Sequence, residues 1–142
     1  MSAFDSFKFR FWDPAGTVRQ LINTWNPSDC NTEKDYEKSL YSYLRSHLQD
    51  IVITPQYAYG RAKADLVVGG KVAIEIKKDL KGTSEFQRLL GQITQFKQWK
   101  GSFIVLLVGS TDLNLLDELR NQSAEVRPFG LEPKVSIIEK IE

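Results

Sequence analysis

Two acids and a lysine in the middle of the chain are the residues best suited to chemistry. Glu75 and Lys77 lie in the segment KVAIEIK, and Asp65 opens the apolar run before it. A strand points alternate side chains to one face, so Glu75 and Lys77 are expected side by side on an otherwise apolar strand. Placing an acid and an amine there costs free energy unless they meet a partner, a metal ion or solvent. The pattern predicts a functional cluster; the alternative is a solvated face with a cross-strand ion pair.

The connection between the two apolar runs decides whether Asp65 joins this cluster. A Gly-Gly dipeptide separates the runs, and we expect them to form a β-hairpin. A two-residue turn would place Asp65 opposite Ile74, on the face away from Glu75, because directly opposed residues share a face. A three-residue loop at 69–71 would place Asp65 opposite Glu75 and would use the backbone freedom of glycine. We therefore predict the three-residue loop.

The oxygen atoms of this cluster suit a divalent metal ion. Asp65 and Glu75 would supply two carboxylates, and Ile76 a backbone carbonyl by its position. These are the hard ligands that Mg²⁺ or Mn²⁺ prefers, with water completing the octahedron. Such an ion makes water more acidic and places positive charge beside a phosphate, which phosphodiester hydrolysis requires. Lys77 would orient or deprotonate that water, or stabilise the developing negative charge.

The elements that position the cluster follow from apolar periodicity and turn residues. Pro55 indicates an edge position or an irregularity in its strand, and Ser84 is the expected cap of the helix that it begins. The apolar run 101–110 suits a strand buried on both faces. Segment 7–12, FKFRFW, alternates like a short strand. Helices are expected over 14–25, 33–48, 84–99 and 112–122, and further strands over 51–58, 64–68, 71–77 and 135–141.

This order predicts an α/β fold with a central mixed sheet flanked by helices. We expect a single domain over 1–142, with an N-terminal extension over 1–29 and a core over 30–142. The net charge of +1 does not indicate a nucleic-acid partner, so such affinity would need a local basic patch. The single cysteine excludes an intrachain disulfide and a thiolate zinc cluster. No signal peptide or membrane span is readable, so a soluble cytoplasmic protein is expected.

The motif Asp65, nine intervening residues, then Glu75-Ile76-Lys77 resembles the PD-(D/E)xK, or restriction-endonuclease-like, nuclease superfamily. The resemblance implies an α-β-β-β-α-β core, followed here by a C-terminal helix and strand. It implies that Asp65 and Glu75 hold Mg²⁺ and that Lys77 assists the attacking water. Many members also carry an acid on the first helix. Glu37, on the inward stripe of helix 33–48, is the preferred candidate, and Glu33, one turn earlier, the weaker one.

A further match lies on the helix after the hairpin. Gly91-Gln92 followed by Phe96 looks like the Gln-x-x-x-Tyr element of the lambda-exonuclease and recombination-type branch, with Phe in place of Tyr. The replacement removes a hydroxyl, so Gln92 alone would contact the metal-bound water or a phosphate. The strand proline of the family motif is missing, and Ala64 precedes Asp65, a position that is permissive in the family.

The resemblance implies a Mg²⁺-dependent deoxyribonuclease, endo- or exonuclease, with RNA as another substrate class. Arg61, Lys63 and Lys78 surround the motif and are expected to contact the phosphate backbone. Lys78 with Asp79 could equally cap a strand end. One alternative is a catalytically silent module of the same fold that binds nucleic acid or a protein partner. Another is an interaction protein that forms oligomers through a sheet edge or segment 7–12, and self-association as a homo-oligomer is compatible with every reading.

Overall fold

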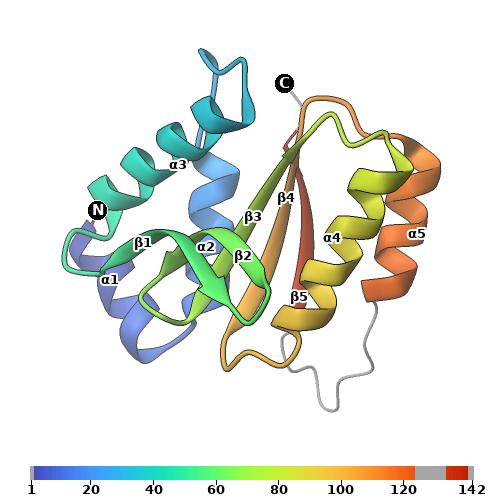
Figure 1. Cartoon of the computed structure of the whole chain (residues 1–142). Coiled ribbons are helices and arrows are strands. Elements are labelled where there is room, and N and C mark those ends of the chain that lie inside the picture. The colour runs from blue at the N-terminus through green and yellow to red at the C-terminus, as the bar shows by residue number, and fades with distance from the viewer. Residues whose placement is uncertain (1, 124–133, 141–142) are drawn as a thin grey trace.

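The computed structural model describes residues 2–123 and 134–140, which contain a five-stranded mixed sheet of order β1-β2-β3-β4-β5 (Figure 1). Three strands form an antiparallel meander: β1 (Ile53–Tyr59), β2 (Ala62–Val68) and β3 (Val72–Lys78). The strand β4 (Ser102–Val108) runs parallel to β3, and β5 (Val135–Lys140) runs parallel to β4. The predicted α/β fold with a mixed sheet is confirmed. Pro55 lies on the edge strand, as its missing N–H requires.

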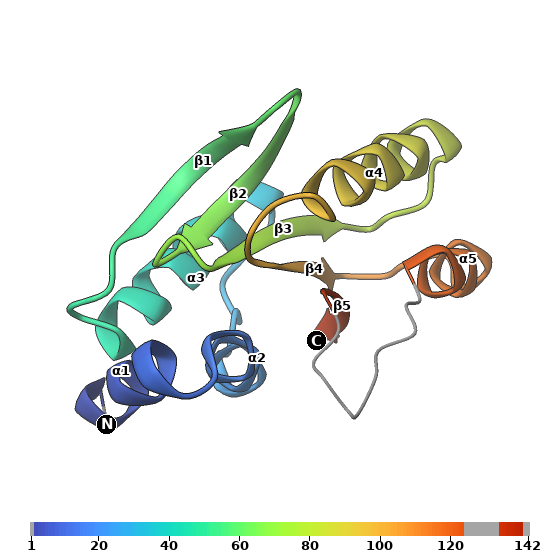
Figure 2. The same cartoon turned by 90° about the horizontal axis from the view of Figure 1, so that it is seen from below.

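Helices cover both faces of this sheet (Figures 1 and 2). On one side lie α1 (Ser2–Phe11), α2 (Pro14–Thr24) and α3 (Glu33–His47), and on the other α4 (Thr83–Phe96) and α5 (Leu113–Ser123). None of the described helices has the length and apolarity needed to cross a bilayer.

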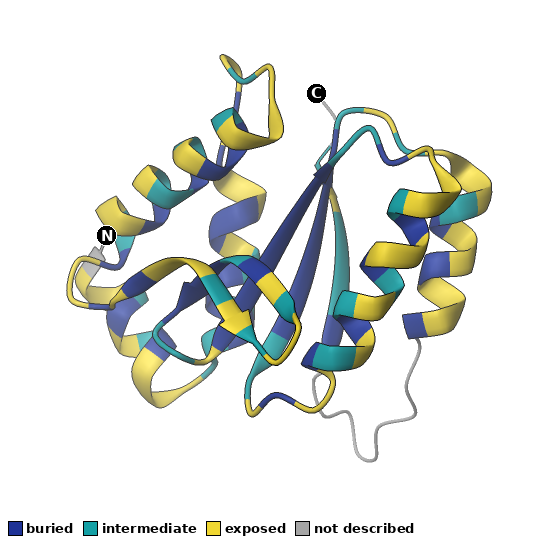
Figure 3. Ribbon diagram, in the orientation of Figure 1, coloured by how far each residue is buried: buried dark blue, intermediate teal, exposed yellow. Residues whose placement is uncertain are grey.

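The sheet separates two apolar cores. On the first face Leu40 and Leu44 of α3 pack with Ile74 and Leu106 of the sheet, and on the second face α4 packs on the other side of the same strands. Every residue of β4 from Phe103 to Val108 is buried, as predicted for a strand covered on both faces (Figure 3). Because β3 and β4 are buried along nearly their whole lengths, the strand that carries Glu75 and Lys77 is firmly packed.

Two details differ from the sequence prediction. Segment 7–12 was predicted as a strand, but it lies in α1 and the turn that follows, because Phe9 packs into the core while Phe7 and Phe11 project one helical turn apart on the outer side. An alternation over six residues does not distinguish the two periods. The predicted cap Ser84 lies inside α4; Gly82 is the N-cap, and no side chain caps that end.

Candidate active site

The loop between β2 and β3 has three residues, as predicted. Leu66 pairs with Ile74 and Val68 with Val72, which leaves 69–71 as the connection. Gly69 and Gly70 have φ angles of 58° and 66°, in the left-handed region that glycine adopts without strain. Continued one position further, this register places Asp65 directly across from Glu75, so the hairpin brings the first two motif residues together.

Backbone pairing between β2 and β3 stops where the two acids face each other. The ladder ends at Leu66 and Ile74, and carboxylates take over beyond it. The Asp65 N–H donates to Glu75 Oε1 at 3.2 Å, and the Ile76 N–H donates to Asp65 Oδ2 at 2.8 Å. Each carboxylate therefore takes the place of a backbone carbonyl. A strand residue points its N–H and C=O to the same neighbour, so the Ile76 carbonyl also faces Asp65.

The other side of Asp65 is irregular as well. Pairing of β1 with β2 omits Gln56, the residue across from Asp65, although it continues on both sides of that position. Gln56 has φ 53°, a left-handed conformation that is unfavourable for a residue other than glycine. Its side chain donates to Glu37 Oε1 at 3.1 Å. Gln56 thus connects the edge strand to Glu37, the predicted acid on α3. The sequence analysis did not identify Gln56; its only signal was the irregularity that Pro55 indicates.

Glu37 lies on the inward side of α3, as predicted, and is 8% exposed. Lys34, one turn earlier, places its Nζ 3.6 Å from Glu37 Oε2. Burial raises the pKa of Asp65, and the negative charges of Glu37 and Glu33 raise it further. The hydrogen bond from the Ile76 N–H and the charge of the Lys77 ammonium lower this pKa in part. The acids of α3 therefore act electrostatically on the Asp65 carboxylate.

Glu75 and Lys77 are side by side on β3, as the strand period predicts. They are 5% and 8% exposed, and Lys77 Nζ lies 3.4 Å from Glu75 Oε2. Burial and the neighbouring charge of Asp65 raise the pKa of Glu75 to about 7, and a hydrogen bond from Gln92 and the charge of Lys77 oppose this rise. The ammonium of Lys77 faces the two carboxylates of Asp65 and Glu75, so negative charge exceeds positive charge at this position.

Gln92 extends from α4 toward the same place. Its Nε2 donates to the Lys63 carbonyl at 2.9 Å, and its amide also contacts Glu75. Its Oε1 is buried and has no hydrogen-bond partner. Burying a hydrogen-bond acceptor without a donor costs free energy, so this oxygen is suited to accept a hydrogen bond from a water molecule or a ligand.

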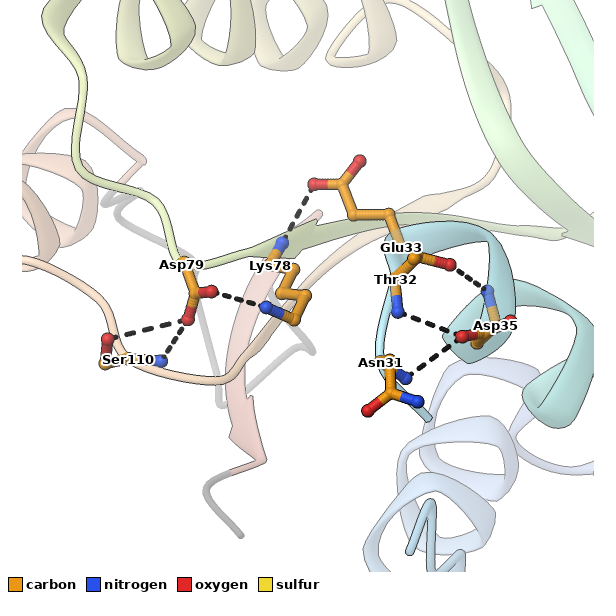
Figure 4. A network of polar contacts seen from close by, with 7 residues as sticks. All are labelled: Asn31, Thr32, Glu33, Asp35, Lys78, Asp79 and Ser110. Atoms are coloured by element: carbon orange, nitrogen blue, oxygen red, sulfur yellow. Dashed lines mark hydrogen bonds and ion pairs between the residues drawn. The ribbon is translucent and has the colours of Figure 1, made fainter. Parts of the chain in front are cut away.

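Glu33, the weaker acid candidate, connects the start of α3 to the end of β3 (Figure 4). Its Oε2 accepts from the Lys78 N–H at 2.9 Å. The side chain of Lys78 turns to Asp79, with 2.5 Å between Nζ and Oδ2, and Asp79 also accepts from the Ser110 N–H. Asp79 itself has φ 54°. Lys78 and Asp79 therefore cap the end of β3, which was the alternative to a contact of Lys78 with phosphate. The Lys78 ammonium is already paired with Asp79.

The other two basic candidates are exposed. Arg61 lies in the turn between β1 and β2, four residues before Asp65, and Lys63 lies on β2, two residues before it. The backbone carbonyl of Lys63 holds Gln92, while its ammonium lies on the surface. These two exposed residues lie on the stretch of chain that leads into Asp65.

The donor set agrees with a divalent ion in part. No three or more His, Cys, Asp or Glu side chains of the described residues are grouped closely enough to hold a metal ion. The predicted set has only two carboxylates, Asp65 and Glu75, so the Ile76 carbonyl and water would complete it. Burial and neighbouring carboxylates raise the pKa values of both acids, and a positive ion bound between them would lower these values.

Comparisons with protein-family models, with curated proteins and with solved structures find no match. The function is therefore inferred from the geometry of the site itself.

Proposed function

We propose that the protein is a Mg²⁺-dependent nuclease of the PD-(D/E)xK type that hydrolyses phosphodiester bonds in DNA. The observation that carries the proposal is the break in the sheet at Asp65 and Glu75, where a half-buried and a buried carboxylate replace backbone pairing beside Lys77. A solvated strand face with an ordinary ion pair would leave these groups exposed and the ladder intact. The order α3, β1 to β3, α4 and β4 is also the order expected of a restriction-endonuclease-like core.

The two carboxylates would hold the metal ion with the oxygen atoms that the backbone does not use. Asp65 binds the Ile76 N–H through Oδ2, and Glu75 binds the Asp65 N–H through Oε1. Each side chain is thereby fixed in orientation. Asp65 keeps its second oxygen, and the second oxygen of Glu75 lies 3.4 Å from Lys77 Nζ, so the ion and this ammonium would share it. Such preorganisation is valuable, because a site held by its neighbours loses little entropy when it binds.

A bound Mg²⁺ would supply positive charge beside the phosphate and a more acidic water. In the hydrolysis the water oxygen bonds to phosphorus, the ester oxygen leaves, and the proton of the water passes to that leaving oxygen or to solvent. Lys77 would donate to the attacking water or to a phosphate oxygen, where charge develops. Gln92 Oε1 would accept from the same water, and Glu37, held by Gln56, would orient it from the opposite side.

A cleavage assay with charge-removing variants tests the proposal. Asp65→Asn and Glu75→Gln keep an acceptor for the backbone N–H groups, and Lys77→Met keeps the length of the side chain. Each should lower Mg²⁺-dependent cleavage of DNA by about 100-fold or more. Asp117→Asn, on the exposed surface of α5, is the matched control and should cleave normally.

The substrates should include linear, circular, single-stranded and branched DNA as well as RNA, with thermal unfolding recorded for each variant. Cleavage that survives in folded Glu75→Gln and Lys77→Met proteins would contradict the mechanism. Calorimetric titration with Mn²⁺ adds a readout that does not depend on activity. Binding of Mn²⁺ and DNA without cleavage of any substrate would support the silent module instead.

A further inference from the structure

The outer face of α1 carries a patch of aromatic side chains that the described residues leave uncovered. Phe4, Phe7, Phe11 and Trp12 are 60%, 54%, 75% and 73% exposed. Four of the six exposed large apolar side chains of the described residues thus lie within nine positions of the chain. The first three recur at helical spacing and share one face, and the rings of Phe7 and Phe11 lie 5.3 Å apart.

The opposite face of the same helix is also apolar. Phe9 is 1% exposed and packs into the core with residues of α2 and α3, and Ser6 is buried beside it. A helix that is apolar on both faces is expected to be covered on both. In Figure 2, α1 lies at the outside of the molecule, on the far side of the sheet from α4, so its outer face is accessible to a partner.

From this patch we infer that α1 forms a homodimer with α1 of a second copy, the two helices packing antiparallel. The four side chains expose on the order of 500 Å² in each chain, so a symmetric pair would bury about 1,000 Å², which reaches the lower limit of specific interfaces. A symmetric interface requires a surface that complements itself. Phe7, Arg10 and Phe11 also line a cavity of about 440 Å³ with Asp50. The patch thus has both projecting rings and a cavity, as a surface that packs against its own copy requires.

The charges of α1 also favour the antiparallel arrangement. Asp5 lies in the first turn, and Lys8 and Arg10 lie in the last. Antiparallel packing brings the acidic first turn of each copy to the basic last turn of the other and opposes the two helix dipoles. An anionic membrane would need a border rich in Lys and Arg. Here Arg10 is paired with Asp50 at 3.2 Å, so the patch fits a second chain better than a lipid surface.

Sedimentation velocity from about 1 to about 100 µM tests the inference, since an interface of this size is expected to have a micromolar Kd. The wild-type chain should shift from monomer to dimer over this range. Phe7→Glu with Phe11→Glu should remain monomeric with unchanged thermal unfolding, because both side chains are on the surface. Leu113→Glu, a change at an equally exposed apolar residue on α5, should dimerise like the wild type.

Cysteine crosslinking tests the direction of the helices in a Cys30→Ser background. Chains with Phe4→Cys mixed with chains with Phe11→Cys should form a mixed disulfide, whereas Phe4→Cys alone should not. Efficient crosslinking of Phe4→Cys with itself would overturn the antiparallel arrangement. A wild-type chain that is monomeric at 100 µM, a dimer that persists in the double glutamate variant, or a monomer that floats with phosphatidylserine vesicles would overturn the inferred dimer.

Discussion

Glu75 is the residue at which burial and charge oppose each other most strongly. Its carboxylate is 5% exposed, lies across from a second acid and has one ammonium within 3.4 Å. Its pKa is raised to about 7 from the usual value of 4.5, so the folded protein binds a proton there more tightly than the unfolded chain does. The proton-bound form is therefore the one that folding favours, and ionisation of Glu75 opposes folding.

This gives a prediction for stability against pH. The contribution of Glu75 is fully present below about pH 4.5 and is lost as pH rises to about 7, because the folded state holds the extra proton in this window. The free energy of unfolding of the metal-free protein should fall by roughly 3 kcal/mol across it, the equivalent of the shift in pKa. Urea unfolding at several pH values measures the effect.

Glu75→Gln is the control for that series. It has no proton to lose, so its stability should depend less on pH between about 4.5 and 7. Addition of Mn²⁺ should stabilise the wild type more at pH 8 than at pH 5, since a cation binds the ionised acid. Equal pH dependence in the wild type and in Glu75→Gln would show that this carboxylate is not the group responsible.

Gln56 combines a strained backbone with a contact to the site, and two variants separate these roles. Gln56→Val should destabilise the protein by about 1 to 2 kcal/mol, although the position is an exposed edge strand, because a β-branched residue resists φ 53°. Gln56→Asn tolerates this conformation but is too short to reach Glu37. It should keep the stability within about 0.5 kcal/mol and lower the proposed cleavage rate. Unfolding curves and initial rates of both variants make the test.

At the scale of elements, the length of one hairpin loop decides the composition of the site. Deletion of Gly70 leaves only two residues between Val68 and Val72. A hairpin that keeps its three-residue loop must then draw Val68 into the loop, which pairs Val67 with Val72 and moves Asp65 opposite Ile74, onto the other face. The deletion should abolish Mn²⁺ binding in calorimetry. It should also lower stability, because the shifted register turns the apolar residues of β2 away from their core.

Gly70→Asn is the matched control, because it keeps the loop length and asparagine tolerates φ 66°. A Cβ at Gly70 would come no closer than 3.9 Å to another atom outside the loop, so this change should bind Mn²⁺ like the wild type. A Gly70-deleted protein that folds, as judged by circular dichroism, and binds Mn²⁺ with unchanged affinity would refute the importance of the register.

At the scale of the whole molecule, charge is nearly balanced. With a net charge of +1, the chain has no overall attraction for a polyanion, so binding of DNA would depend on a few local side chains. Arg61 and Lys63 are exposed on the turn and strand that lead to Asp65, while Lys78 is paired with Asp79. The three basic candidates should therefore contribute unequally.

The salt dependence of DNA binding measures these contributions. In a Glu75→Gln background, which prevents cleavage, Arg61→Ala and Lys63→Ala should each reduce the slope of log K against log salt by about 0.7 to 0.9. Lys78→Ala should change it less, since its ammonium already has a partner. Fluorescence anisotropy at several salt concentrations gives the slopes, and equal effects of all three changes would contradict the unequal roles.

The sequence alone predicted most of the elements and the grouping of Asp65, Glu75 and Lys77. The apolar periods of 33–48 and 84–99 predicted α3 and α4, and the unbroken apolar run predicted the central strand. The strand period placed Glu75 beside Lys77, and the Gly-Gly dipeptide predicted the loop that brings Asp65 to them. These features depend on near neighbours in the chain, whose spacing is fixed by backbone geometry.

The tertiary structure alone decided how distant segments complete the cluster. Gln56 on the edge strand reaches Glu37 on α3, and Glu33 reaches the N–H of Lys78, across 19 and 45 positions of the chain. Packing also decided that segment 7–12 is helical, because docking of Phe9 outweighs a weak local alternation. Such contacts depend on how the helices pack against the sheet, and no local pattern in a single sequence indicates this packing.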